Sequence, residues 1–159
     1  MRRVIGIDPG ISTTGFGIIE GYDDTLEVVT FGTIVSSAKK PIYDRLSILY
    51  DRICQVIQEY QPTEMAVEES FFSKNPRTAL VLGQARGVIL LAGAHQHIKC
   101  FEYTPRKIKM SVVGSGAASK EQVQFMVKSI LKLDEHPSSF DITDALATGM
   151  CHLNQMKLS

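Results

Sequence analysis

The order of the apolar segments leaves few folds open to this chain. Three segments rich in β-branched and aromatic residues follow one another at 3–7, 15–20 and 26–35, with turn-forming residues between them. Short connections between successive strands predict an antiparallel meander. Helical and strand patterns then alternate, and such α/β units predict a mixed sheet that is flanked by helices.

An amphipathic helix is predicted at 42–60, because Ile42, Leu46, Leu49 and Ile53 recur at spacings of three and four. Pro62 prevents this helix from continuing. After it the patterns predict, in order, a strand, a helix, a strand and three helices: 64–69, 78–94, 98–103, 105–112, a helix capped by Ser119 that ends at 133, and 140–156. We therefore predict an α/β fold with a five-stranded mixed sheet, in a single domain over residues 1–159.

Four carboxylates lie next to segments that are expected to be buried. Asp8 follows the first strand pattern, Glu68 ends the fourth, and Asp141 and Asp144 precede the apolar run 145–147. Buried carboxylates that converge repel one another, so they need a cation between them. Mg²⁺ or Mn²⁺ suits a cluster of oxygen ligands. These acids are therefore the candidate metal ligands.

Simpler explanations exist for some of these acids. Asp141 and Asp144 share one helix face at a spacing of three, and both lie in the first turns, where acids stabilise the helix end. On spacing alone, helix capping is the favoured explanation for that pair. Asp8 begins a common turn sequence. The adjacent residues Glu68 and Glu69 point to opposite faces of a strand, so one of them faces either the core or a site.

The net charge of zero hides an uneven distribution along the chain. Residues 70–133 contain ten basic and two acidic residues, whereas residues 1–69 contain six basic and eleven acidic ones. A basic segment of this kind favours a polyanionic partner such as a phosphate backbone. Lysines and arginines that only solvate helix faces would give the same count, and charge alone does not separate the two interpretations.

The sequence predicts a cytoplasmic protein with no membrane segment. The apolar run at the N-terminus is too short for a signal peptide. The most apolar stretch, 79–94, contains Gln84 and Arg86 and is shorter than a membrane span requires. His152, on the last predicted helix, has no pattern of neighbours that supports it as a metal ligand.

Short motifs run in order along nearly the whole chain, and together they are more specific than any one of them. They are Gly6-Ile7-Asp8-Pro9-Gly10, Thr14-Gly15-Phe16-Gly17, Ala66-Val67-Glu68-Glu69 with Phe71 and Lys74-Asn75, Leu82-Gly83-Gln84-Ala85-Arg86-Gly87, Phe101-Glu102-Tyr103, Val112-Val113-Gly114 and Asp141-Ile142-Thr143-Asp144-Ala145-Leu146-Ala147. The ordered set resembles the RuvC family, the bacterial Holliday-junction resolvases. That family has a ribonuclease-H-like fold, which agrees with the element order.

The resemblance implies a catalytic, metal-binding site of Asp8, Glu68, Asp141 and Asp144. Glu68 rather than Glu69 takes the role, because it stands where the family motif places its acid. Two Mg²⁺ ions are implied, with Mn²⁺ able to substitute. One ion activates water and the other stabilises the leaving 3′-oxygen, which gives a 5′-phosphate and a 3′-hydroxyl.

The resemblance also implies DNA contacts. Phe71 matches an aromatic residue that acts on unstacked bases, and Lys109 and Lys120 match basic residues near the scissile phosphate. Weaker candidates for backbone contacts are Lys74, Arg77, Arg106 and Lys107. For each single basic residue, an ordinary solvated side chain remains the alternative.

The implied activity is resolution of four-way DNA junctions by paired symmetric nicks, during homologous recombination and DNA repair. Two symmetric nicks call for a two-fold homodimer. The helix at 78–94, which is apolar almost all round, is expected in or near the interface, although a buried central helix would have the same composition. Other expected partners are the junction-binding and branch-migration motor proteins of the same pathway.

Three other functions are compatible with parts of the pattern. An actin-like or sugar-kinase-like ATPase opens with a similar strand and turn, but it needs two such domains. A related nuclease that acts on structured RNA would use the same acids. A DNA-binding module without catalysis would not be expected to keep four acids in a site for a polyanion.

Overall fold

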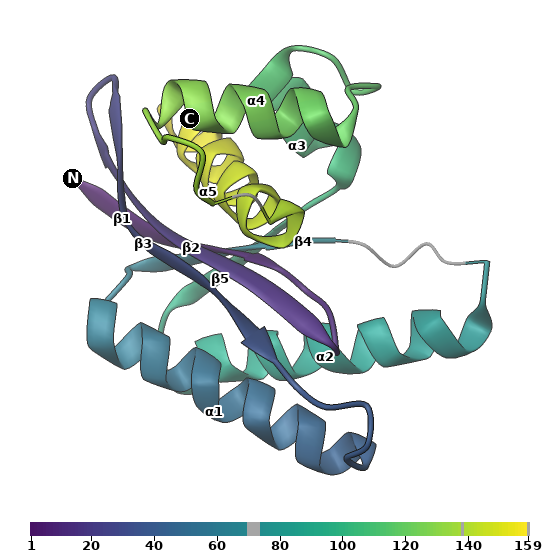
Figure 1. Ribbon diagram of the computed structural model, residues 1–159. Helices are drawn as coiled ribbons and strands as arrows, with labels where there is room; N and C mark the ends of the chain where they lie inside the picture. The colour runs from purple at the N-terminus through teal and green to yellow at the C-terminus, as the bar shows by residue number, and fades with distance from the viewer. Residues whose placement is uncertain (70–73, 138, 159) are drawn as a thin grey trace.

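A five-stranded mixed sheet forms the centre of the protein, in the computed structural model that describes residues 1–69, 74–137 and 139–158 (Figure 1). Its strands are β1 (Arg2–Asp8), β2 (Thr13–Tyr22), β3 (Thr25–Val35), β4 (Glu64–Glu68) and β5 (Lys99–Tyr103). The spatial order is β3-β2-β1-β4-β5. The first three strands pair antiparallel, and β4 pairs parallel with both β1 and β5. The predicted fold class is confirmed.

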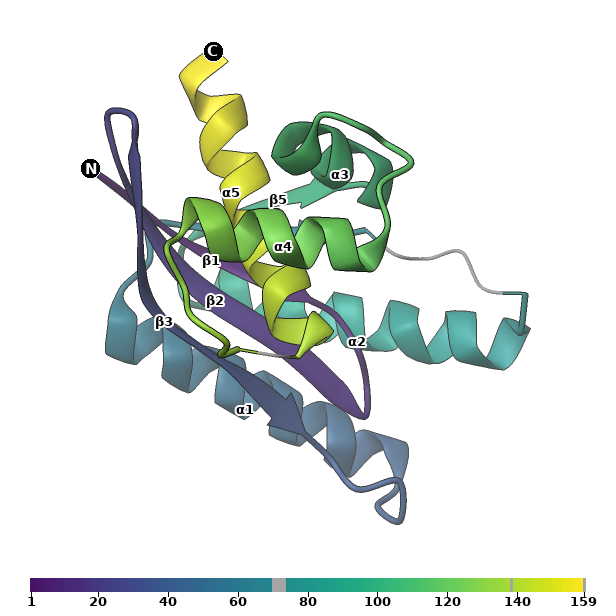
Figure 2. The ribbon, with the colours of Figure 1, turned by 45° about the horizontal axis from the view of Figure 1, so that its top comes forward.

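Helices cover both faces of the sheet. One face carries α1 (Ile42–Tyr60) and α2 (Pro76–His95), and the other carries α3 (Pro105–Val113), α4 (Lys120–Ile130) and α5 (Phe140–Leu158) (Figure 1). Successive residues of β1 point to opposite faces, so Val4 joins the core under α3–α5 while Ile5 and Ile7 join the core over α1 and α2. Figure 2 shows α4 lying across α5, which itself lies on the sheet.

Most predicted boundaries agree with the structure to within two residues, and the differences have local causes. α1 has the predicted bounds, 42–60. α2 begins two residues early, because the Asn75 side chain accepts hydrogen bonds from the backbone amides of Arg77 and Thr78. α4 ends at Ile130 rather than at 133, since Lys132 adopts a positive φ of 54° that no α-helix continues.

α5 lies directly on the backbone of β1 and β2. A Cβ atom added at Gly6 would come within 2.1 Å of the Ala145 carbonyl oxygen, and one added at Gly15 within 2.0 Å of the Asp141 carbonyl oxygen. Only glycine permits so close an approach. The first two turns of α5 are therefore held against the ends of the two strands, and this contact positions the acids described next.

Candidate active site

Three segments that are far apart in the sequence bring acidic side chains to one edge of the sheet. β1 and β4 are parallel neighbours in a register that pairs Ile7 with Val67, so Asp8 and Glu68 follow at the same edge. Asp144 lies in the second turn of α5, which crosses this edge. The strand order and the glycine contacts of α5 therefore produce the convergence that the sequence predicted for these three residues.

Their carboxylates form a tight cluster. Asp8, Glu68 and Asp144 each offer an oxygen atom that lies within 4.8 Å of the other two, and all three residues are partly buried. At this spacing, one cation could be held by all three carboxylates.

Asp141 lies at the margin of this cluster. Within the part of the chain that the structure describes, its carboxylate is not among the three that could together hold one ion. Its negative charge nevertheless contributes to raising the pKa values of both Asp8 and Asp144. The predicted fourth ligand is thus electrostatically part of the site.

Burial and mutual repulsion dominate the electrostatics of the acids. Burial raises the pKa of Asp8 to about 10, and the charge of Glu68 adds to this effect. Burial and Glu68 also raise the pKa of Asp144, to about 6, although Lys120 and Lys109 act in the opposite direction. A divalent cation would relieve this repulsion, and an all-oxygen donor set suits a hard cation. The residues present therefore fit a divalent metal.

Two lysines share a small hollow with the acids. The hollow has a volume of about 170 Å³, and its lining includes Glu68, Asp144, Lys109 and Lys120. Lys109 lies on α3, which Thr104 caps, and Lys120 is the first residue of α4, which a capping box from Ser119 begins. The capped N-termini of α3 and α4 thus help to position both lysine side chains near the carboxylates.

The other predicted DNA contacts lie in different surroundings. The Lys107 ammonium group lies 5.6 Å from the centre of the Tyr103 ring. Arg106 packs over Gly116. Arg77 lines a separate groove of about 680 Å³ together with Lys40 and Arg45, and Lys74 is exposed before α2. Phe71 lies outside the described residues.

Sequence reasoning missed a residue that supports the Asp8 turn. The Arg45 guanidinium group donates to Ser36 Oγ at 3.0 Å and to Ser12 Oγ at 3.1 Å, and Ser36 Oγ donates to the Ile11 carbonyl at 2.7 Å. These bonds fix the loop that follows Asp8. Arg45 lies in the acidic part of the sequence, and no motif marks it, so only its contacts reveal this role.

Comparison with known proteins identifies the family. Residues 4–152 match the family model described as "Crossover junction endodeoxyribonuclease RuvC". The chain belongs to the RuvC family. The resemblance carried by the sequence motifs is therefore confirmed.

Similar RuvC proteins match over nearly their whole length. The crossover junction endodeoxyribonuclease RuvC of Halothermothrix orenii is 44% identical over 156 residues, which are 98% of this chain and 94% of that protein. The corresponding protein of Caldicellulosiruptor saccharolyticus is 47% identical over 152 residues, or 95% and 92% of the two chains. A structure of Thermus thermophilus RuvC in complex with Holliday junction substrate superposes with a TM-score of 0.94 at 30% identity, covering 99% and 96%.

We predict that Asp8→Asn stabilises the metal-free protein, and does so more at pH 8 than at pH 5. In the unfolded chain Asp8 ionises near pH 4, whereas in the folded protein its pKa is about 10. Between these values folding takes up a proton, so wild-type stability falls as the pH rises, by up to about 1.4 kcal/mol per pH unit. Asparagine does not titrate.

Thermal melts in EDTA at the two pH values measure the effect. Adding Mg²⁺ should shrink the advantage of the variant, because only the wild type gains from binding the cation. If the melting temperatures of Asp8→Asn and wild type differ by the same amount at both pH values, the pKa of Asp8 is not raised in the folded protein.

Proposed function

We propose that this protein is a structure-specific endonuclease that resolves four-way DNA junctions by paired symmetric nicks, in homologous recombination and DNA repair. The observation that carries the proposal is the cluster of Asp8, Glu68 and Asp144 beside a hollow that Lys109 and Lys120 also line, in a member of the RuvC family. Support for the substrate comes from the Thermus thermophilus RuvC structure, which contains a Holliday junction.

The four acids Asp8, Glu68, Asp141 and Asp144 are the proposed catalytic and metal-binding residues. The proposed cofactor is Mg²⁺, two ions per site, with Mn²⁺ able to replace it. When bound, the ions would activate water and stabilise the leaving 3′-oxygen, and the products would be a 5′-phosphate and a 3′-hydroxyl. The protein's own part is to hold oxygen ligands at fixed positions in a partly buried site, where water competes less for the cation.

Lys109 and Lys120 are the proposed contacts to the scissile phosphate. Their charges lower the pKa of Asp144, against the larger effect of burial, and so help to keep that ligand ionised. They also offset the negative charge that a phosphate must approach. Phe71 is the proposed base-stacking residue, and Lys74, Arg77, Arg106 and Lys107 are the proposed backbone contacts.

The proposed assembly is a two-fold homodimer with α2 in the interface. Leu80 and Leu91 of α2 are 63% and 48% exposed. Between them lie Gly83 and Gly87, where an added Cβ atom would meet nothing within 4 Å. These four residues form one stripe along the helix, and the glycines would permit another helix to approach closely. Two such protomers would present two active sites to one symmetric junction.

α2 is long and apolar enough to cross a membrane by length and composition alone. Its packing on α1 and the bidentate ion pair of Arg86 with Glu102 of β5 support a place for this helix within the folded domain instead. We propose that residues 1–159 act as one cytoplasmic nuclease domain. Its further proposed partners are the junction-binding and branch-migration motor proteins.

The acids are tested by Asp8→Asn, Glu68→Gln, Asp141→Asn and Asp144→Asn. Each should reduce cleavage of a synthetic four-way junction in Mg²⁺ by at least about 100-fold, since even residues that only orient metal ligands contribute about 10–100-fold. Junction affinity, measured by gel shift in EDTA, should not fall, because the basic residues supply it. Glu69→Gln is the matched control, and its activity should stay close to wild type.

If a variant of one of the four acids keeps near-normal turnover, that acid is not part of the active site. If the wild-type protein cleaves structured RNA but not four-way DNA, the proposed DNA substrate is wrong and structured RNA takes its place.

Lys109→Ala and Lys120→Ala should each lower the cleavage rate and flatten the salt dependence of junction binding. One phosphate contact contributes about 0.9 to the slope of log affinity against log salt concentration on B-DNA. Lys99→Ala is the control, because Lys99 is exposed at the opposite end of β5 from the site. An unchanged slope and rate in both variants would mark them as ordinary surface lysines.

Gly87→Gln should convert the dimer to a monomer, because it places a large side chain on the exposed stripe of α2. The protomer itself has room for this side chain. Ser129→Gln, on the exposed surface of α4, is the control and should leave the dimer intact. Sedimentation at micromolar concentration distinguishes the states. A wild-type protein that stays monomeric on junction DNA would disprove both the dimer and the paired nicks.

A further inference from the structure

A buried histidine connects α5 to two strands of the sheet. His152 has no exposed surface, and both nitrogens of its ring are hydrogen-bonded. Nδ1 lies 2.6 Å from the Tyr103 hydroxyl, and Nε2 lies 2.8 Å from a carboxylate oxygen of Glu64. The Phe101 ring packs against the imidazole, with 4.6 Å between the ring centres. These contacts fix both the position and the orientation of the side chain.

The direction of each hydrogen bond follows from the surroundings. Glu64 pairs with Arg2, and a carboxylate only accepts hydrogen bonds, so Nε2 of His152 donates to it. In the neutral imidazole, Nδ1 then carries no proton and accepts a hydrogen bond from the Tyr103 hydroxyl. Glu64 in turn accepts a hydrogen bond of 3.0 Å from Arg2.

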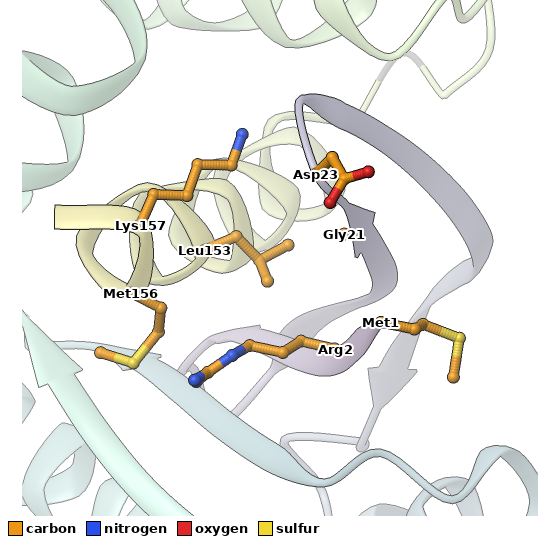
Figure 3. Close-up of a pocket in the computed structure, with 7 residues that line it drawn as sticks. All are labelled: Met1, Arg2, Gly21, Asp23, Leu153, Met156 and Lys157. Carbon is orange, nitrogen blue, oxygen red and sulfur yellow. The ribbon is translucent and has the colours of Figure 1, made fainter. Parts of the chain in front are cut away.

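Arg2 extends the network to β1. In Figure 3 its side chain runs from the start of the chain beneath α5, on the side of Met156 and Leu153. The residues drawn there line a hollow of about 230 Å³ at the C-terminal end of the helix, and none of them belongs to the acidic cluster. The network thus joins the far end of α5 to β1, β4 and β5.

His152 and Asp144 define two ends of the same contact between α5 and β4. On α5, Asp144 precedes His152 by eight residues, or about 12 Å of helix. On β4, Glu64 precedes Glu68 by four residues, or about 13 Å of strand. The two lengths match. The hydrogen bond between His152 and Glu64 therefore lies at one end of the contact between α5 and β4, and the carboxylates of Asp144 and Glu68 approach each other at the opposite end. A shift of the helix along the strand at the first end moves Asp144 at the second.

The rest of the α5 contact determines how closely the helix approaches the sheet. It consists mainly of glycine and aliphatic surfaces, including Gly6, Gly149 and Leu146 against Gly17. Apolar attraction is non-directional, whereas a hydrogen bond weakens steeply outside a narrow range of distance and angle. The hydrogen bonds of His152 therefore add a directional restraint on the register of α5 against β4, beyond the close contact at the glycines.

We propose that His152 is a positioning residue of the active site. Held by Tyr103 and Glu64, it sets the place of Asp144 relative to Glu68 and Asp8, and thereby the affinity of the three acids for a divalent cation. The inference rests on the proposed function only in that these acids hold the cation.

Tyr103→Phe tests the proposal, because it removes one hydroxyl group and leaves the ring in place. Binding of Mn²⁺ to the DNA-free protein is measured from the electron paramagnetic resonance signal of free Mn²⁺. The variant should bind Mn²⁺ about 10-fold more weakly than wild type, the lower end of what residues that orient metal ligands contribute. Glu64→Ala should show a similar loss, whereas Glu64→Gln keeps an acceptor oxygen for Nε2 and should retain more of the affinity.

The structure offers a matched control in Tyr50→Phe. The Tyr50 hydroxyl lies 2.5 Å from Nδ1 of His95 and joins α1 to α2 on the opposite face of the sheet. Both tyrosine variants lose one hydroxyl contact with a histidine, so both should lower the melting temperature. Only Tyr103→Phe should weaken Mn²⁺ binding. Wild-type Mn²⁺ affinity in a folded Tyr103→Phe protein would overturn the proposal and leave the network a stabilising role alone.

The outcomes for the site and for His152 are separable. If wild type binds Mn²⁺ but does not cleave a four-way junction, the proposed function fails while the Mn²⁺ titrations still decide the role of His152. If both proposals hold, Tyr103→Phe should cleave at close to the wild-type rate at saturating Mn²⁺ and should require about 10-fold more of the ion to reach half of that rate.

Discussion

Repulsion among buried carboxylates is the constraint on which the rest of this structure depends. Asp8, Glu68 and Asp144 bring oxygen atoms within 4.8 Å of one another in a partly buried place, where negative charges are costly. Such an arrangement persists only if the surrounding fold stabilises it from elsewhere. The sheet, the glycine contacts of α5 and the two nearby lysines each contribute to that support.

The support is divided between rigid backbone and opposite charge. β1 and β4 lie side by side with apolar residues on both faces, so the ends that carry Asp8 and Glu68 cannot separate without exposing two cores. α5 approaches the strands at Gly6 and Gly15, which brings Asp144 within reach. Lys109 and Lys120 counter the repulsion only in part, since Asp144 still has a raised pKa. The remaining negative charge is what gives the site its affinity for a cation.

The sequence was sufficient for features that depend on local pattern and insufficient for those that depend on distant partners. The bounds of α1 were predictable, because an apolar period of three and four residues continues up to Pro62. The convergence of the acids followed from the order of the strands. By contrast, 88 positions separate Glu64 from His152, and no periodicity relates them. The same holds for the contact of the Lys107 ammonium group with the Tyr103 ring, which no pattern in the sequence indicates.

The proposed active site and the proposed dimer interface lie on different faces of the sheet, and residues 69–75 connect the two. α3, α4 and α5 cover the face with the proposed active site, while α1 and α2 cover the face proposed for the second protomer (Figure 1). β4 ends at Glu68 and α2 begins at Pro76, so the proposed interface helix starts only eight residues after a proposed ligand. The ion pair of Arg86 with Glu102 fastens that helix to the edge strand β5. In a two-fold dimer built on α2, this ion pair and the packing of α2 on α1 would help to fix the distance between the two acid clusters, as two nicks at symmetric positions require.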